Sequence, residues 1–454
     1  MRPSLPDRII EILMSGPRSG AELTGALGVS QPTISRALRE LEPHRVLRTG
    51  STKGARYALR RTIGAVGSRW PVYRIDEEGT PHELGTLNAI ERDGYFTTGG
   101  PERIRGFFEH DIPYFLQDAR PEGFLGRAIP AAFPELDLPL RVADWTDEHF
   151  LSYLTQRAAD SPGNLIVGAE SLDRYLSARQ GPVIVPANRR DTEYPKMATA
   201  AMSGAPPGSS AHGEHPKFTA CLTDEAGYSH VIVKFSPPRA TPTGQRWADL
   251  LIAEHLAHRV LEEHGIAACQ SSLLEHADRL FLECVRFDRI GRNGRSGVVS
   301  LFALDTARYG NLDTWSASAQ RLADDSALSA EDAARIRFLD AFGALIANTD
   351  RHFGNISLFD RHEGVFKLAP VYDMLPMLFA PQDGQSVPRQ FAPGPPTAAS
   401  LSVWERARDC ADTYWDGLSQ EPRLSAEFRQ LCAQCRAALR AMPRRATPPA
   451  PRPA

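Results

Sequence analysis

The sequence predicts an α+β protein of several domains, in which a small helical module with a β-wing precedes a larger, two-lobed body. Its 454 residues exceed what one hydrophobic core normally accommodates. Apolar residues near the N-terminus recur at helical spacing, whereas later segments mix short β-runs with amphipathic helices. Residues 1–61 hold 11 Arg or Lys against 5 Asp or Glu, although the whole chain has a net charge of −3. This basic module on a mildly acidic body indicates that only the N-terminal part meets a polyanion.

The composition excludes several classes of protein. A hydrophobic content of 42% and a charged content of 24% are ordinary for a soluble globular protein. The start, MRPSLPDRII, lacks the apolar core of a signal peptide, and no apolar run approaches the roughly 20 residues of a membrane-spanning helix. Among the scattered cysteines, the close pair Cys432 and Cys435 has no second pair to complete a zinc site. We therefore expect a cytoplasmic protein with reduced thiols and no membrane contact.

Three short helices are predicted near the N-terminus. The first spans residues 7–15, and Ser19 can cap a second helix with its side-chain oxygen. A tight turn at Gly28 separates the second helix from a third over residues 31–42, which Ser30 can cap. The third helix has apolar residues on one face and polar or basic residues on the other, as in the recognition helix of a helix-turn-helix.

Two strands, predicted over residues 46–49 and 57–59, flank a turn at 50–55 and indicate a wing beside these helices. A winged helix-turn-helix reads base edges with its third helix and meets phosphates with basic residues of the wing. We therefore predict that residues 1–61 bind DNA. The residues expected to contact DNA are Gln31, Thr33, Ser35, Arg36, Arg39, Lys53 and Arg56. The alternative is a three-helix protein-interaction module whose basic face is only solvated.

The remainder of the chain divides by pattern into two lobes and a tail. Residues 70–185 mix short β-like runs with Pro- and Gly-rich loops, and one clear helix is predicted over 147–156. Residues 186–441 form the largest block, which is interrupted by a loop at 203–216 rich in Gly, Ser, Pro and His. Residues 442–454 contain five prolines and no apolar pattern, so we predict a disordered tail.

The most informative stretch begins with a buried helix predicted over residues 331–347. A polar loop containing Asp350 and Asn355 follows, then a β-hairpin, then Asp373. This is the order of parts in protein kinases, where the first Asp accepts the substrate proton and the other two residues hold the Mg²⁺ of ATP. It favours a two-lobed, protein-kinase-like fold. Two alternatives remain open: a hydrogen-bonded loop that only holds a domain together, and an Asp/His metal site of hydrolase type.

A kinase also requires an upstream lysine on a strand and a glutamate on the following helix. The apolar run SHVIVKF places Lys234 in a buried strand, and a helix predicted over 249–262 offers Glu254 as its partner. By themselves these residues could be an edge lysine that reaches solvent and a glutamate on a solvated helix face. Their order relative to Asp350 favours an ion pair at the ATP phosphates.

The segments NTDRHFGN and LAPVYDMLP resemble the active-site signature of the HipA family of toxin kinases. The resemblance covers roughly residues 70–440 and implies a HipA-like fold and a serine/threonine protein kinase that uses ATP and Mg²⁺. It gives Asp350 the role of catalytic base, and it makes Asn355 and Asp373 the metal ligands.

The same resemblance implies further nucleotide contacts. The family positions concerned correspond here to Val285, Phe287, His352 and Tyr372. Val285 replaces a glutamate that some members use, and Phe287 could instead be an ordinary core residue. A loop that covers the phosphates in the family corresponds to a segment with Ser209, Ser210 and Gly213, and either serine is a candidate for autophosphorylation that shuts the site.

Partners follow from the resemblance as well. In typical members a separate HipB antitoxin binds DNA and neutralises the kinase, whereas here the DNA-binding module is fused, as in the YjjJ-like branch. We expect a translation component such as an aminoacyl-tRNA synthetase as the phosphorylated protein, a HipB-like antitoxin, and a homodimer on a pseudo-palindromic DNA site. The rival hypothesis is a DNA-binding transcription regulator whose kinase-like body only senses a nucleotide or ligand.

Overall fold

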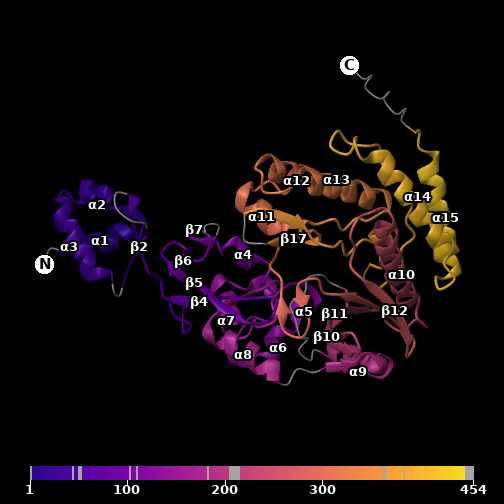
Figure 1. Cartoon of the computed structure of the whole chain (residues 1–454), viewed down its shortest axis with the longest axis horizontal. Helices are drawn as coiled ribbons and strands as arrows, with labels where there is room; N and C mark the ends of the chain where they lie inside the picture. Colours follow the sequence, from indigo (N-terminus) through magenta and orange to yellow (C-terminus); the bar gives the residue numbers. More distant parts are fainter. Residues whose placement is uncertain are drawn as a thin grey trace, which may run out of the picture. The chain divides into compact units, whose positions relative to one another are not determined.

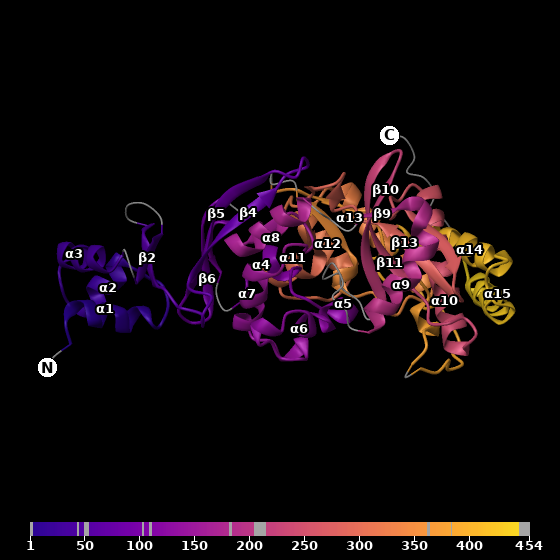
Figure 2. The same ribbon diagram turned by 90° about the horizontal axis from the view of Figure 1, so that it is seen from below.

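The structure is a computed structural model in which the chain forms two compact units (Figures 1 and 2). The described residues are 3–42, 45–49, 54–101, 104–108, 111–180, 184–203, 215–360, 364–382 and 384–444. The first unit comprises Met1–Asp76, Thr80–Arg120 and Phe133–Gly181. The second comprises Glu77–Gly79, Pro121–Ala132 and Pro182–Ala454.

The first unit begins with three helices and a small antiparallel sheet of order β1-β3-β2. The elements are α1 (Leu5–Leu13), β1 (Arg18–Ser19), α2 (Gly20–Leu27), α3 (Gln31–Leu41), β2 (Val46–Thr49) and β3 (Arg56–Leu59). Their shared core includes Ile9, Leu23 and Ile34, which are completely buried. The three helices and then β2 and β3 come in the expected order, whereas β1, which pairs with β3, was not expected. Gly28 ends α2 in the left-handed conformation that favours glycine, with φ of 65°.

Ser19 and Ser30 occupy the N-cap positions of α2 and α3, but only Ser19 forms the expected cap. The Ser19 hydroxyl accepts a hydrogen bond from the Glu22 amide, and the Glu22 carboxylate accepts one from the Ser19 amide, which confirms the expected cap. Ser30 occupies the N-cap position of α3 but forms no side-chain cap bond. Its hydroxyl lies 2.9 Å from the Thr33 hydroxyl, so these two side chains satisfy each other and not a helix amide.

A five-stranded antiparallel sheet of order β7-β6-β5-β4-β8 forms the rest of the first unit. Its strands are β4 (Arg69–Ile75), β5 (Pro81–Ile90), β6 (Gly94–Gly99), β7 (Gly106–Phe108) and β8 (Leu165–Val167). Helices α7 (Asp147–Gln156) and α8 (Ala169–Gln180) pack beside it, together with the short α4 (Tyr114–Gln117) in the same unit. The bounds of α7 are those expected from the sequence.

The N-terminal module is joined to this sheet by hydrogen bonds and by an apolar cluster. The Arg61 amide donates to the Ala89 carbonyl at 3.0 Å, and the Glu91 amide donates to the Leu59 carbonyl at 3.0 Å. The cluster consists of Leu47, Ala58, Ile90, Phe96 and the partly buried Phe107. Because β2 and β3 contribute to this cluster, the small sheet of the module belongs to a core that it shares with the larger sheet.

A second five-stranded sheet, of order β12-β13-β11-β10-β9, organises the second unit, and its strands are antiparallel except for the β9–β10 pair. These strands are β9 (Ile184–Pro186), β10 (Lys217–Asp224), β11 (Gly227–Phe235), β12 (Ser271–His276) and β13 (Arg279–Val285). Helix α10 (Pro242–Glu263) packs on the sheet. It begins before the expected residue 249 because Thr241 caps it and a proline is tolerated in the first turn.

Further helices and small sheets complete the second unit. The helices are α5 (Gly123–Arg127), α6 (Ile129–Ala132), α9 (Arg190–Met202), α11 (Leu301–Arg308), α12 (Trp315–Asp324), α13 (Ala330–Leu345), α14 (Trp404–Gln420) and α15 (Ala426–Ala441). The strands are β14 (Arg289–Ile290), β15 (Gly294–Arg295), β16 (Val298–Ser300), β17 (Ser357–Asp360) and β18 (Phe366–Leu368). Helix α13 is the buried helix expected before the polar loop. In the described chain, no helix has the length and apolar content that crossing a membrane requires.

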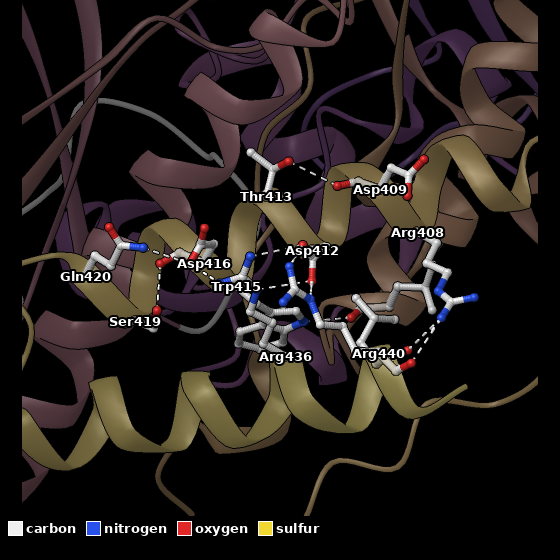
Figure 3. Close-up of polar contacts among 12 residues, drawn as sticks. Arg408, Asp409, Asp412, Thr413, Trp415, Asp416, Ser419, Gln420, Arg436 and Arg440 are labelled. Atoms are coloured by element: carbon white, nitrogen blue, oxygen red, sulfur yellow. Dashed lines mark hydrogen bonds and ion pairs between the residues drawn. The ribbon is translucent and has the colours of Figure 1, made fainter. Parts of the chain in front are cut away.

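Helices α14 and α15 lie side by side and are joined by ion pairs (Figure 3). Asp412 of α14 accepts hydrogen bonds from Arg436 and Arg440 of α15 at 2.7–3.1 Å. Arg436 also contacts Asp416, which lies one turn further along α14. Arg408 donates to main-chain carbonyl groups at the C-terminal end of α15, where helical partners are lacking. The two helices therefore act as one layer.

Replacing Asp412 by Asn should lower the free energy of unfolding by about 1 kcal/mol at neutral pH, the upper end for partly exposed ion pairs. The hydrogen bonds from Arg440 and then Arg436 lower the pKa of Asp412 to about 2. Because this folded-state pKa lies below the unfolded value, the stabilisation is present above about pH 4 and is lost as the pH falls towards 2.

Urea denaturation of both proteins at pH 7 and pH 3 measures this difference. The exposed Asp144, whose carboxylate lies 3.8 Å from Arg141, provides the control, and Asp144→Asn should change stability little at either pH. A loss for Asp412→Asn that is the same at both pH values would contradict the role of this carboxylate.

Candidate functional site

One buried asparagine joins the polar loop after α13 to the segment that carries Asp373. The side-chain oxygen of Asn348 accepts a hydrogen bond from the Asp350 amide at 3.0 Å. Its Nδ2 donates to the Asp373 carbonyl at 3.3 Å. Asn348 is 1% exposed, so both bonds are shielded from water. Asn348 was not among the residues expected at the site, although its place just before Asp350 in the motif could have indicated it.

Helices α12 and α13 hold the main chain of this loop. The Trp315 indole donates to the His352 carbonyl at 3.1 Å. The Arg351 side chain passes so close to α13 that a Cβ at Gly343 would come within 2.5 Å of it. A larger residue at position 343 would therefore require the Arg351 side chain to move. These contacts fix the loop while the carboxylate of Asp350 itself remains exposed.

Asp350 and Asn355 are positioned by one hydrogen bond. Asn355 is buried, and its Nδ2 donates to the Asp350 carbonyl at 2.8 Å. This bond orients the amide and leaves Oδ1 as an acceptor, the type of ligand that Mg²⁺ prefers. Partial burial raises the pKa of the Asp350 carboxyl, against the opposing effect of His352. A raised pKa improves a carboxylate as a proton acceptor.

Lys234, Glu254 and Asp373 form a charged triad in which Lys234 and Glu254 are buried and Asp373 is partly exposed. Lys234 Nζ lies 2.7 Å and 2.8 Å from the two carboxylate oxygens of Glu254, and it also contacts the Asp373 carboxylate. Glu254 is completely buried and accepts a further hydrogen bond from the Asp373 amide at 3.3 Å. Asp373 has a φ of 56°, a strained conformation for a residue with a side chain. The structure thus brings together residues from β11, α10 and the segment after β18.

Contacts within the triad keep Lys234 and Asp373 charged. Burial lowers the pKa of Lys234, but the carboxylates of Asp373 and Glu254 outweigh burial, and this pKa lies above its ordinary value. Burial raises the pKa of Asp373, but the ammonium groups of Lys234 and Lys217 outweigh it and hold this pKa below its ordinary value. At neutral pH, therefore, Lys234 is a cation and Asp373 an anion.

A second lysine, Lys217, faces the same cleft and was not among the expected site residues. It lies opposite Lys234 in the β10–β11 pairing and is 3% exposed. Burial lowers its pKa to about 8, so a substantial fraction is protonated at neutral pH. The sequence contained no signal for this residue, because its position depends on the register of two strands.

Of the expected nucleotide residues, Phe287 and Tyr372 lie ring to ring, whereas Val285 packs against the apolar core of the second sheet. The Phe287 ring lies 5.9 Å from the Tyr372 ring, at an angle of 34°. The Tyr372 hydroxyl donates to the Gly354 carbonyl at 2.8 Å, and the Val285 carbonyl accepts a hydrogen bond from the Cys269 thiol at 3.2 Å. Val285, Phe287 and Tyr372 are half-buried, so each offers surface to a flat ligand.

Two cavities meet at Asp350 and His352. The first has a volume of about 560 Å³ and is lined by the triad, by Lys217 and by the pair His215 and Trp247, among others. The second has a volume of about 690 Å³ and is lined by the other side of the polar loop and by residues 390–392. Within the described ranges, no group of three or more His, Cys, Asp or Glu side chains forms a metal site.

The residues expected to bind DNA differ in their surroundings. Arg36 and Arg39 are exposed on α3, and they form no ion pair with any described residue. Gln31 and Thr33 are also exposed but are engaged locally, since Gln31 accepts a hydrogen bond from Thr24 at 2.8 Å and Thr33 pairs with Ser30. Ser35 is half-buried.

Arg56 has contacts inside the first unit that the sequence did not indicate. It donates to the Pro17 carbonyl at 3.1 Å, and its guanidinium lies 5.4 Å from the centre of the Phe107 ring. These contacts draw the side chain towards the larger sheet because β3 packs there. The remaining expected residues that fall outside the described part of the chain are Lys53, Ser209, Ser210 and Gly213.

Replacing Lys234 by Met should lower the free energy of unfolding by about 3 kcal/mol, because it leaves the buried Glu254 carboxylate and the partly exposed Asp373 carboxylate without their cation. The double variant Lys234→Met with Glu254→Gln should recover part of this loss. Lys196, whose pair with Glu193 is exposed, is the control, and Lys196→Met should cost less than about 1 kcal/mol. Urea denaturation at pH 7 measures all three, and equal losses for Lys234→Met and Lys196→Met would contradict the importance of the triad.

Comparisons with known proteins agree with this arrangement. The model of the YjjJ-like toxin middle domain matches residues 66–176, and that of the HipA-like C-terminal domain matches residues 209–442. The chain is 35% identical to Toxin YjjJ of Escherichia coli (strain K12) over 433 residues, which cover 94% of this chain and 96% of that protein.

Solved structures are similar at lower identity. HipA of Shewanella oneidensis MR-1, in complex with HipB and its operator DNA, has a TM-score of 0.51 at 14% identity, with 82% of this chain and 95% of that chain covered. The Helicobacter pylori proinflammatory kinase CtkA has a TM-score of 0.37 at 13% identity, with 51% of this chain and 88% of that chain covered. The family models and the full-length relative together show that the chain belongs to the HipA-like toxin family.

Proposed function

We propose that this protein is an ATP- and Mg²⁺-dependent serine/threonine protein kinase that acts as a toxin. The observation that carries the proposal is the charged triad of Lys234, Glu254 and Asp373, which lines the same cavity as the exposed carboxylate of Asp350. A structural ion pair alone does not require an exposed carboxylate beside it. A phosphoryl-transfer site requires both, because a cation must hold the phosphates and a base must accept a proton.

Each residue has a distinct role in this reaction. Asp350 accepts the proton of the acceptor hydroxyl, while the bond from that oxygen to the γ-phosphorus forms and the bond to ADP breaks. Lys234 holds the phosphate oxygens, and Glu254 orients Lys234. Asn355 and Asp373 supply the oxygen ligands that would hold Mg²⁺, which neutralises phosphate charge when bound.

The partners of the kinase are proposed from the family. The relative that is 35% identical to this chain is named a toxin. The similar HipA structure is a complex with HipB and operator DNA. We infer that this chain phosphorylates a translation-related protein such as an aminoacyl-tRNA synthetase and that a HipB-like antitoxin opposes it. Autophosphorylation at Ser209 or Ser210 would silence the same site. A homodimer would match the two-fold symmetry of a pseudo-palindromic DNA site.

DNA binding through a winged helix at residues 1–61 is the second part of the proposal. Arg36 and Arg39 support it, because they are exposed on α3 and free to meet phosphates. The same observation favours the second candidate function, a DNA-binding transcription regulator whose kinase-like body senses a nucleotide. Labelling by ATP separates the two candidates, since only a kinase transfers the γ-phosphate.

The replacements Asp350→Asn and Asp373→Asn should each reduce phosphate transfer at least about 100-fold, the usual contribution of a positioned proton acceptor or metal ligand. The measurement is incorporation of labelled γ-phosphate from ATP with Mg²⁺ into the purified chain and into a cell lysate. Removal of Mg²⁺ by EDTA should abolish it. Asp409→Asn, on the outer face of α14, should retain activity. Equal labelling by wild type and Asp350→Asn would contradict the kinase proposal.

The double variant Arg36→Ala with Arg39→Ala should weaken DNA binding and reduce the dependence of affinity on salt by about one unit of slope for each lost phosphate contact. The measurement is a gel shift at several salt concentrations, with a duplex from the region upstream of the gene and an unrelated duplex. Arg141→Ala, an exposed arginine remote in sequence from α3, should bind as wild type. Wild-type affinity that does not fall with salt would contradict phosphate contacts.

A further inference from the structure

One half-buried histidine in the cleft has no hydrogen-bond partner among the described residues. His215 stands just before β10 and lines the same cavity as the triad. Both ring nitrogens are shielded from solvent, and within the described part of the chain neither has a hydrogen-bond partner. The main chain of Phe235 lies near enough to influence the ring weakly, but not in hydrogen-bond geometry. A buried polar group without a partner is unfavourable, so its retention in a cleft indicates a ligand.

The ring is held in place by an aromatic contact. The centre of the His215 ring lies 4.4 Å from that of Trp247, at an angle of 48°. Trp247, Leu251 and Glu254 line the cavity from one face of α10, at the four- and three-residue spacing of a helix. The histidine therefore lies along the row of side chains that leads to the triad.

The charges around the ring select the chemistry of the ligand. Burial and then the nearby Lys234 and Lys217 lower the pKa of His215 to about 3, so the ring is neutral and has one N–H donor. The cavity is lined by these two lysines and by the carboxylates of Glu122, Glu254, Asp350 and Asp373, so an anion that binds beside the lysines would do so together with a metal cation. The rings of Phe287 and Tyr372 do not line this cavity. A phosphate chain fits these groups, because its oxygens only accept hydrogen bonds.

We propose that His215 binds the phosphate chain of the nucleotide by donating a ring N–H to a phosphate oxygen. This assignment rests on the proposed kinase function, since it needs a nucleotide in the cleft. The competing explanation is that His215 only packs on Trp247. Packing requires a flat ring at this position but no nitrogen, so the two explanations predict different effects of removing the nitrogens while the ring is kept.

The test is equilibrium binding of Mg-ATP, of Mg-ADP and of adenosine to the full chain by calorimetry. His215→Phe keeps the ring but removes both nitrogens, and it should weaken ATP and ADP binding about tenfold, as the loss of one charge-assisted hydrogen bond predicts. His215→Gln restores a donor and should stay within about threefold of wild type. Adenosine should bind all variants equally. His276→Phe, at the exposed end of β12, is the matched control.

Each outcome decides between the explanations. ATP binding by His215→Phe that equals wild type, or a loss that is equally large for adenosine, would overturn the phosphate contact. If His215→Phe does not fold, His215→Met removes the same nitrogens and carries the same expectation. Wild-type protein that binds no ATP would overturn the proposed function and this assignment with it, whereas wild-type ATP binding that the His215 variants leave intact would overturn only the assignment.

Discussion

The charged contact between Lys234, Glu254 and Asp373 is the constraint on which the rest of the second unit depends. Removing one cation and two carboxylates from water is costly, and their attraction offsets that cost only when the geometry is tight. The three residues come from a central strand, from the helix on that sheet and from the chain after a distant hairpin. Sheet, helix and hairpin must therefore meet at one point, which is also where the cavity opens.

The Asp373 segment also helps to hold the position of the exposed Asp350, because Asn348 is bonded to both. The Asp350 side chain is exposed, but its loop is held by hydrogen bonds. Asn348 joins the loop to the main chain of Asp373, and Trp315 joins it to α12. A reactive group can remain accessible only if its neighbours hold its position, because an exposed loop would otherwise sample many conformations. Buried residues thus fix the geometry of the loop, while the Asp350 carboxylate remains open to the cavity.

In the first unit, one part of the N-terminal module packs against the larger sheet and another part stays exposed. The small sheet of the N-terminal module contributes Leu47 and Ala58 to a core shared with the larger sheet, and Arg56 is drawn into that contact. Arg36 and Arg39 of α3, in contrast, are exposed. A polyanion that meets the module would therefore meet α3 more readily than β3. The sequence assigned Arg56 to phosphate contact because of its place in the predicted wing, and the structure adds contacts of this side chain with Pro17 and Phe107.

The sequence by itself determined the α+β class, the helices α7 and α13, the Ser19 cap, and the pairing of Lys234 with Glu254 as an expectation. Helical periodicity and motif order are local properties, so they can be read without a fold. Only the tertiary structure decided that Asp373 joins that pair, that Lys217 stands opposite Lys234, that Asn348 links two segments, and that His215 packs against Trp247. Each of these contacts depends on strand register or joins residues that are far apart in the sequence. The local preference of a segment for helix or strand does not determine which distant residues it will contact.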